Sequence, residues 1–178
     1  FRIAFRLASG IFVLNETDKE FVRTSGFVSK KQPVIKVNGT GIDLGEFAET
    51  PVSDPASPRF LLIARLLREK GISEFAEAAR LRRAEFPQAR FQLLGRFDTN
   101  PGALGPEDVE RWQQEGLIEY LGETDDVRPF LRDCTVYVLP SWREGMPRTV
   151  MEAMAVGRAV VTTDVPGCRE TVVDHDNG

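Results

Sequence analysis

Two acidic residues, Glu144 and Glu152, lie eight positions apart in the segment PSWREGMPRTVMEAMA. Gly145 lets the backbone approach a ligand closely, and the proline that follows suits the start of a helix. Unpaired amides in that first helical turn would face a phosphate or a sugar, and a carboxylate at Glu152 can accept hydrogen bonds from a vicinal diol. Glu144 could bind the hydroxyls of a second ring, and simple capping of the helix by acids is an equally good interpretation. The residues around the turn are Met146, Pro147, Arg148 and Thr149.

Two cations, Arg65 and Lys70, follow a continuous apolar run at 60–64. We expect them at the carboxyl end of a strand and just before a helix, where the positive end of the helix dipole adds to their charge. Arginine binds phosphate oxygens through paired hydrogen bonds, and lysine supplies a compact point charge. The pair therefore indicates a diphosphate site. The alternative is a solvated loop in which Arg68, Glu69 and Lys70 pair among themselves.

Two glycine-bearing turns follow neighbouring predicted strands, one at Gly95 and Arg96 and the other at Gly122 and Glu123. Turns at adjacent strand ends can form the walls of a pocket for a nucleotide base. Plain strand-to-helix turns explain these residues equally well.

Several other chemistries find no support. The sequence contains neither GxxxxGKS nor GxxxxGKT, which excludes a P-loop, and its single histidine, His175, argues against a Ser-His-Asp triad. Asp174 and Asp176 flank that histidine as DxD, a metal–diphosphate motif, but the Asn177–Gly178 that follows indicates an exposed turn. We therefore predict no metal site and no cofactor.

Composition narrows the class of partner. The chain has 178 residues and a net charge of -4, which argues against nucleic acid or an anionic membrane as the main partner. No apolar run approaches the roughly 18 residues of a membrane span. Two cysteines, Cys134 and Cys168, build neither a disulfide framework nor a CxxC site, so we expect a cytoplasmic, reducing location.

Short apolar runs alternate with helical patterns along most of the chain, which predicts a parallel, doubly wound, Rossmann-like α/β sheet. Ligands of such a sheet bind at the carboxyl ends of the strands, where the three candidate segments fall. The predicted strands are 11–14, 34–37, 60–64, 91–94, 118–121, 136–139 and 159–162. The predicted helices are 16–24, 72–86, 106–115, 125–132 and 149–156.

A change in composition divides the chain into three parts. Residues 39–58 are rich in glycine, proline and small polar residues, which is typical of a hinge and an exposed connector. Gly39–Thr40–Gly41 opens like a dinucleotide fingerprint, but Gly45 comes one residue late, so a hinge is the better interpretation. We predict a strand–helix–strand piece at 1–38 and the ligand-binding domain at 59–178.

Three segments together resemble the nucleotide-sugar-binding domain of glycosyltransferase family 4, whose members have the two-domain GT-B fold. They are NGTGID at 38–43, the R-x4-K-G run that starts at Arg65, and REGMPRTVMEAMAVGRAVVTTDVPG at 143–167, which contains the family's Glu-x7-Glu motif. The resemblance covers about residues 10 to 172 and implies that this chain is the C-terminal half of such an enzyme.

The resemblance also implies roles for the candidate residues. The cations matching Arg65 and Lys70 hold the donor diphosphate, with help from the residues after Glu144. The glutamate matching Glu144 contacts the donor sugar and is the candidate catalytic residue, and the one matching Glu152 contacts the ribose. Loops equivalent to 95–98 and 121–124 border the base.

Members of this family transfer a sugar from a nucleotide-diphosphate donor with retention of anomeric configuration and without a metal ion. The sequence of the longest match is similar to that of the subgroup of enzymes that extends lipid-linked oligosaccharides for capsule, O-antigen or glycoprotein glycans. That likeness favours a UDP-sugar, often an N-acetylhexosamine, as donor and a glycan or polyprenyl-linked acceptor. A full-length enzyme of this kind would be cytoplasmic and peripheral at the inner face of the bacterial plasma membrane.

The acceptor domain of the family is represented here only by its last strand–helix–strand. We therefore expect a donor-binding fragment that is inactive alone, with 11–37 poorly packed or paired with another chain. Other interpretations are an isomerase like the UDP-N-acetylglucosamine 2-epimerases, a non-catalytic nucleotide-binding α/β module, and a glycosidase. The glycosidase fits poorly, because its two carboxylates must flank one bond.

Overall fold

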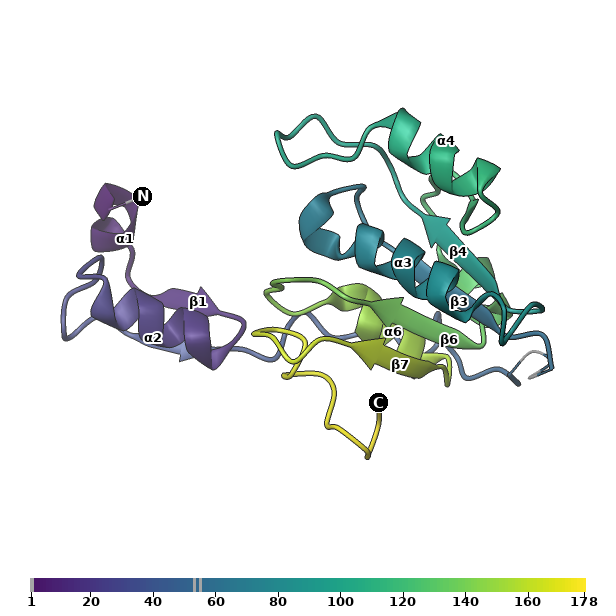
Figure 1. The fold of residues 1–178 in the computed structure, drawn as a ribbon. Coiled ribbons are helices and arrows are strands. Elements are labelled where there is room, and N and C mark those ends of the chain that lie inside the picture. Colours follow the sequence, from purple (N-terminus) through teal and green to yellow (C-terminus); the bar gives the residue numbers. More distant parts are fainter. Residues whose placement is uncertain (1, 53, 55) are drawn as a thin grey trace.

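The strands form two parallel sheets joined by an extended connector (Figure 1). This computed structural model describes residues 2–52, 54 and 56–178. Of the predicted connector at 39–58, residues 53 and 55 therefore lie outside the described residues.

The larger sheet has five parallel strands in the order β5-β4-β3-β6-β7. Because the chain adds β4 and β5 on one side of β3 and then returns to add β6 and β7 on the other, the strand order reverses between β3 and β6. Such a reversal is the topological switch point, where ligands bind beyond the carboxyl ends of the strands. The predicted Rossmann-like, doubly wound sheet is confirmed. Its strands are β3 (Arg59–Ile63), β4 (Arg90–Leu94), β5 (Glu119–Tyr120), β6 (Val136–Leu139) and β7 (Ala159–Thr162).

Helices cover both faces of this sheet, because its strands carry apolar side chains on both faces. One buried cluster, which includes Leu62, joins β3 and β4 to α3 (Ile72–Arg82) and α4 (Pro106–Gln114). The other, which includes Leu61, joins the sheet to α5 (Arg128–Asp133) and α6 (Arg148–Ala155). None of the helices in the described part of the chain is long and apolar enough to cross a membrane.

Helix α3 is shorter than the predicted helix at 72–86, since it ends at Arg82 and leaves Phe86 exposed. The physical reason is Pro87, which disfavours the helical conformation of the residue before it. The apolar residue at 86 continues the helical spacing in sequence, but it does not extend the helix.

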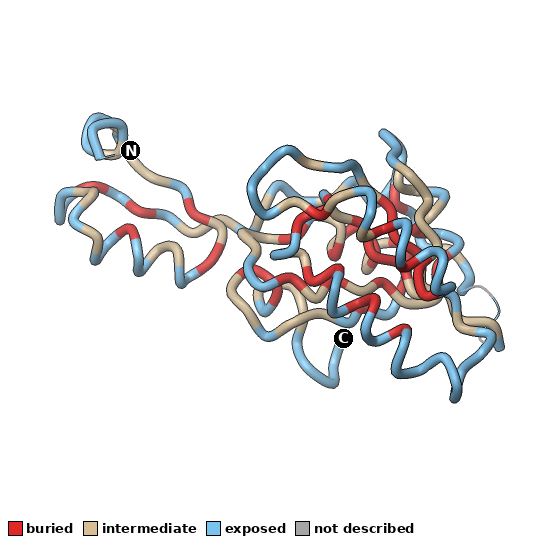
Figure 2. The backbone as a smooth tube through the Cα atoms, turned by 45° about the horizontal axis from the view of Figure 1, so that its top comes forward, coloured by how far each residue is buried: buried red, intermediate tan, exposed pale blue. Residues whose placement is uncertain are grey.

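The smaller sheet pairs β1 (Ile11–Val13) with β2 (Val34–Lys36), and α2 (Glu16–Thr24) connects the two strands. A short helix, α1 (Arg2–Leu7), precedes them and was not predicted. We call residues 2–37 the N-terminal unit. Its strands and helices are formed and its buried cluster is small, so the expectation of a segment that is poorly packed or paired with another chain stays a prediction. That cluster consists of Val13, Val22 and Val34, while Phe12, Phe21 and Ile35 remain exposed (Figure 2).

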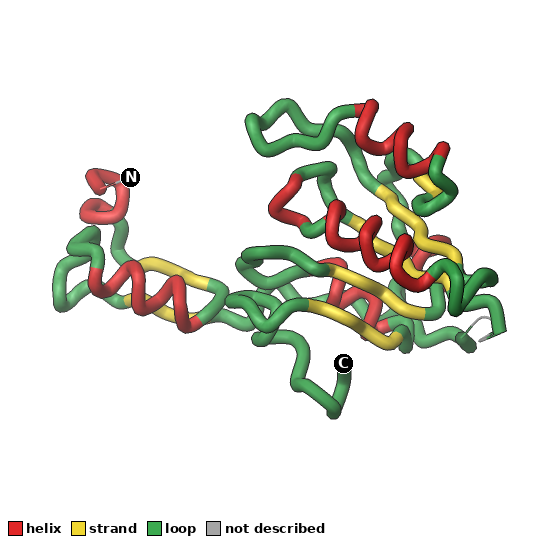
Figure 3. The backbone as a smooth tube through the Cα atoms, viewed as in Figure 1, coloured by secondary structure: helices red, strands yellow, loops and turns green. Residues whose placement is uncertain are grey.

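The carboxyl end of β1 faces the carboxyl end of β6, and the loops of both strands meet between the two sheets (Figures 1 and 3). Asn15, directly after β1, hydrogen-bonds to Gly145 in the loop after β6. The loop after β6, which carries Glu144, therefore lies beside the N-terminal unit.

Candidate functional site

The loops that follow β3 and β6 touch each other at the switch point. The backbone N–H of Trp142 donates to the carbonyl of Glu69 at 2.8 Å, within the short 3-10 helix η1 (Arg68–Lys70). Gly71 has a φ of 71°, and a Cβ on it would lie 2.1 Å from the carbonyl oxygen of Pro140. Only glycine allows this approach, because any side chain would push the two loops apart.

Lys70 and Glu144 form an ion pair across these loops. The Lys70 Nζ lies 2.6 Å from the Glu144 Oε1, and the two side chains are only 15% and 14% exposed. The hydroxyl of Ser141, which is completely buried, donates to the same oxygen at 2.7 Å. The other oxygen, Oε2, accepts no hydrogen bond from the residues that the structure describes. Glu144 is thus held in place with one oxygen free to accept from a hydroxyl.

Backbone amides at the start of α6 lack partners. Pro147 occupies the N-cap position and provides no side-chain hydrogen bond. Within the described residues, the N–H groups of Gly145, Met146, Arg148 and Thr149 have no acceptor. Unpaired amides at a helix N-terminus carry partial positive charge and favour an anion such as phosphate.

Glu152 lies in the second turn of α6 and is 5% exposed. The Arg148 Nε donates to its Oε1 at 2.8 Å. Burial raises the pKa of the Glu152 carboxyl, and the opposing effect of Arg148 does not cancel it. The carboxylate would therefore gain from further donors, such as the hydroxyls of a diol.

Arg65 and Lys70 bind different carboxylates in this structure. The Arg65 Nη1 lies 2.9 Å from the Asp98 Oδ2, in the loop after β4, and the arginine side chain is 47% exposed. The pKa of Asp98 is lowered, mainly by a hydrogen bond from the Asn100 amide and also by Arg65. Because the Arg65 side chain is half exposed, it can move from Asp98 to another anion.

The alternative in which Arg68, Glu69 and Lys70 pair among themselves is wrong. Lys70 pairs with Glu144, and the Arg68 Nη2 lies 3.8 Å from an oxygen of Asp108. The sequence neighbours point in different directions because η1 is a tight turn whose side chains diverge.

The predicted base-binding turns border one cavity of about 600 Å³ on the side of the sheet that faces α5. Gly95, Arg96 and Glu123 line it, while Gly122 supports it by accepting a 2.8 Å hydrogen bond from the Gly95 amide. The structure thus brings the two turns together at neighbouring strand ends. The full lining is Ile63, Leu94, Gly95, Arg96, Glu123, Thr124, Asp125 and Val127.

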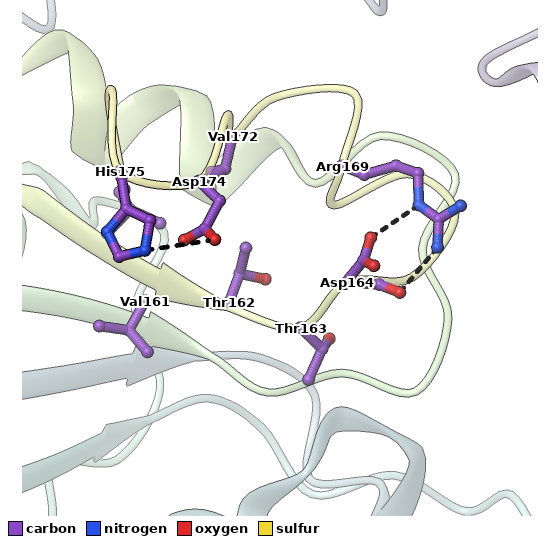
Figure 4. A pocket seen from close by; sticks show the side chains of 10 residues that line it. Val161, Thr162, Thr163, Asp164, Arg169, Val172, Asp174 and His175 are labelled. Carbon is purple, nitrogen blue, oxygen red and sulfur yellow. Dashed lines mark hydrogen bonds and ion pairs between the residues drawn. The ribbon is translucent and has the colours of Figure 1, made fainter.

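A different cavity, of about 640 Å³, lies where the C-terminal segment folds over β7 (Figure 4). Its rim holds an ion pair between Arg169 and Asp164 at 3.0 Å and the exposed Asp174–His175 pair. The His175 side chain is 95% exposed, which confirms the exposed turn predicted for DxD. Among the described residues, no three His, Cys, Asp or Glu side chains are grouped to hold a metal ion.

The sequence interpretation missed two supporting side chains. Tyr137, predicted only as part of a strand, is completely buried, and its hydroxyl donates to the Thr149 Oγ1 at 2.6 Å. Asn15 caps α2 and reaches the loop after β6. An asparagine followed by acidic residues, here Glu16 and Asp18, suits the start of a helix, but nothing in this pattern indicates the distant partner.

Comparison with known proteins decides the family. Residues 57–178 match the family described as Glycosyl transferases group 1. The chain belongs to this family.

Two curated relatives are each 33% identical to the chain. One is the N,N'-diacetylbacillosaminyl-diphospho-undecaprenol alpha-1,3-N-acetylgalactosaminyltransferase of Campylobacter jejuni, aligned over 100% of this chain and 48% of that protein. The other is the putative colanic acid biosynthesis glycosyltransferase WcaL of Escherichia coli, aligned over 81% of this chain and 37% of that protein. The chain therefore spans less than half the length of these relatives.

Solved structures confirm the predicted fold. TarM superimposes with a TM-score of 0.77 at 21% identity, over 96% of this chain and 32% of that one. The pneumococcal O-GlcNAc transferase GtfA, in complex with UDP and GlcNAc, superimposes with a TM-score of 0.71 at 21% identity, over 96% and 33%. Both likenesses concern the GT-B architecture.

Proposed function

We propose that this chain binds the nucleotide-diphosphate part of a sugar donor on behalf of a retaining glycosyltransferase. The observation that carries the proposal is the Lys70–Glu144 pair beside the unpaired amides of α6, at the switch point of the sheet. Cations and free amides suit the diphosphate, and the free oxygen of Glu144 suits a sugar hydroxyl. Family membership favours a transferase over an epimerase-like isomerase or a bare binding module.

In the proposed reaction, the bond between the anomeric carbon and the diphosphate oxygen breaks, and the nucleoside diphosphate leaves with the bonding electrons. The acceptor hydroxyl forms its bond to the same carbon on the same face, and its proton is released. Negative charge grows on the diphosphate in the transition state. Lys70 and the amides of Met146, Arg148 and Thr149 would therefore stabilise the transition state more than the ground state.

The remaining candidate residues take the other parts of the donor. Glu152 accepts hydrogen bonds from the ribose hydroxyls. Added donors would stabilise the charged form of this buried carboxylate, whose pKa is raised. The base occupies the cavity lined by Gly95, Arg96 and Glu123. Arg65 exchanges Asp98 for the diphosphate, which its 47% exposure allows.

Similar proteins support a UDP-sugar donor and a lipid-linked acceptor. The Campylobacter relative is named as an N-acetylgalactosaminyltransferase that acts on a diphospho-undecaprenol, and GtfA was crystallised with UDP and GlcNAc. We therefore propose transfer of an N-acetylhexosamine from a UDP-sugar to a glycan or polyprenyl-linked acceptor. Such a reaction belongs at the cytoplasmic face of the bacterial plasma membrane.

Calorimetry with UDP, GDP and ADP on the 178-residue chain tests the donor site. We expect UDP to bind, and Lys70→Met to weaken UDP binding about tenfold, because a charge-assisted contact to the diphosphate is lost. Lys19→Met is the matched control, since Lys19 lies in α2 and pairs only with Glu16 among the described residues. Absence of binding by all three nucleotides, or equal binding by the two variants, would contradict the proposal.

A further inference from the structure

Asn15 is completely buried and joins the N-terminal unit to the loop at 140–147, between β6 and α6, which we call the donor loop. As the N-cap of α2, its Oδ1 accepts a 2.7 Å hydrogen bond from the Asp18 amide. Its Nδ2 donates to an oxygen of Asp18 at 3.0 Å and to the carbonyl oxygen of Gly145 at 3.1 Å. The cap alone needs only the oxygen, so the amide nitrogen has a separate partner in the loop that carries Glu144.

The bond from Asn15 restricts one particular peptide group. No peptide bond in the described chain is cis, so the carbonyl of Gly145 and the N–H of Met146 lie in their shared peptide plane and point in opposite directions. When Asn15 holds that carbonyl, the Met146 N–H is directed away from Asn15. This N–H is one of the amides without an acceptor among the described residues.

Two further contacts from the N-terminal unit reach the same loop. The Leu14 Cδ1 lies 3.0 Å from the position of a Cβ on Gly145, so the side chain of Leu14 packs on this glycine. The Arg143 Nη2 lies 2.6 Å from the Asp18 Oδ1, directly before Glu144 in sequence. The N-terminal end of α2 is thus seated on the loop from Arg143 to Gly145.

We propose that Asn15 is a positioning residue, which orients the Gly145–Met146 peptide so that the Met146 amide is presented to the donor diphosphate. The inference rests on the proposed function, because the diphosphate is the anion that this amide would bind. It assigns a part of the donor site to the N-terminal unit, outside the domain that carries the family's motifs. Donor affinity then depends on how α2 is seated.

Asn15→Ser separates this role from helix capping. Serine caps a helix about as well as asparagine, but it has no amide nitrogen to reach Gly145. Lys36→Met is the matched control, because it removes the ion pairs of Lys36 with Glu170 at 2.7 Å and with Glu16 at 3.9 Å, while the bond from Asn15 to Gly145 stays. UDP and uridine are the probes, since only UDP carries phosphate.

We expect Asn15→Ser to weaken UDP binding about fivefold and to leave uridine binding unchanged, since only a hydrogen bond to phosphate is affected. Lys36→Met should leave both unchanged. Equal loss of UDP and uridine binding in Asn15→Ser would mean a merely structural role, and equal weakening of UDP binding by Lys36→Met would mean that any contact between the units suffices. Either result overturns the proposal.

Hydrogen exchange of the ligand-free protein keeps this test independent of the donor. If the wild-type chain binds no nucleotide, the proposed function fails, but Asn15 should still order the loop. We expect the paired loop amides of Trp142, which donates to Glu69, and of Glu144, which donates to Pro166, to exchange faster in Asn15→Ser than in Lys36→Met and the wild type. Equal exchange in all three proteins would overturn the role of Asn15.

Discussion

Two carboxylates of the proposed donor site, Glu144 and Glu152, are largely removed from solvent, and each is only partly compensated. Glu144 accepts from Lys70 and Ser141 with one oxygen, while Glu152 has Arg148 as its charged partner. Because Arg148 is 65% exposed, solvent screens its pairing with Glu152. Such carboxylates are suited to accept hydrogen bonds from the hydroxyl groups of a ligand. In the ligand-free protein their burial reduces stability.

Glu152→Gln should therefore stabilise the ligand-free protein at neutral pH. Burial raises the pKa of Glu152, so the folded state holds this proton more tightly than the unfolded state does. The group stabilises the fold while it is protonated, and this contribution is lost as the pH rises through the folded-state pKa. Glutamine removes the cost of the ionised form, so we expect the melting temperature to rise by about 2 °C at pH 7.

Thermal unfolding between pH 4 and pH 8, at intervals of about one unit, checks the sign, since the gain should shrink toward the acid end. The control is Glu107→Gln, an exposed glutamate in the first turn of α4. Calorimetry should show weaker UDP binding by Glu152→Gln, because the ribose loses a charged acceptor. A wild type that is more stable than this variant throughout the range would contradict the argument.

The loops between strands and helices are the elements that build the site, and their shape depends on backbone approach as much as on side chains. The loop after β3 crosses directly beneath the loop after β6, and Gly71 stands at the crossing as the cap residue before α3. The same crossing brings Lys70 to Glu144. Any change that separates the two loops should therefore affect both stability and donor binding.

Gly71→Ala should be far more damaging than Gly26→Ala, although both glycines have nearly the same φ, 71° and 69°. An alanine Cβ at 71 would lie 2.1 Å from the Pro140 oxygen, whereas a Cβ at 26 meets nothing within 4 Å. We expect a cost of about 1 kcal/mol at Gly26 from the backbone conformation alone. At Gly71 the clash should raise the cost to about 3 kcal/mol or more.

Urea unfolding of the two variants and the wild type measures the loss in free energy of unfolding that each substitution causes. UDP binding should be lost in Gly71→Ala and retained in Gly26→Ala, since only the first change moves the loops of the site. Similar free energies of unfolding for the two variants would show that the loops separate without cost.

The molecule as a whole has an uneven distribution of buried surface. Two large clusters lie on the two faces of the five-stranded sheet, whereas the N-terminal unit depends on a cluster of three valines (Figure 2). Contacts to the donor loop through Asn15 and Arg143, and the Lys36–Glu170 pair, attach this unit to the rest. Its stability should therefore depend on those contacts more than on its own core.

Hydrogen exchange should show weaker protection of the two-stranded sheet than of the five-stranded sheet. We expect amides of β1 and β2 to exchange by local opening, at free energies well below that of global unfolding. Amides of β3 and β6 should exchange only with global unfolding, because Leu61, Leu62 and Tyr137 are completely buried between helices. Equal protection of the two sheets would contradict this division, and added UDP should slow exchange in α2 if the donor orders the loop.

Local patterns in the sequence were enough to predict most elements and the regions that carry the site. Strands β6 and β7 lie at the predicted residues, because their apolar runs are bounded by turn residues on both sides. The position of the candidate site at the carboxyl ends of β3 and β6 follows from the order of strands and helices. The helix at 72–86 was predicted too long, since its apolar spacing continues beyond the point where the helix ends.

Partners that are distant in sequence could not be predicted in the same way. Lys70 and Glu144 are 74 positions apart, and Asn15 and Gly145 are 130 apart, so no local spacing relates them. Packing of the two loops and seating of α2 bring these atoms together. Periodicity reports which face of an element is buried, whereas the partner of a side chain depends on how whole elements cross in space.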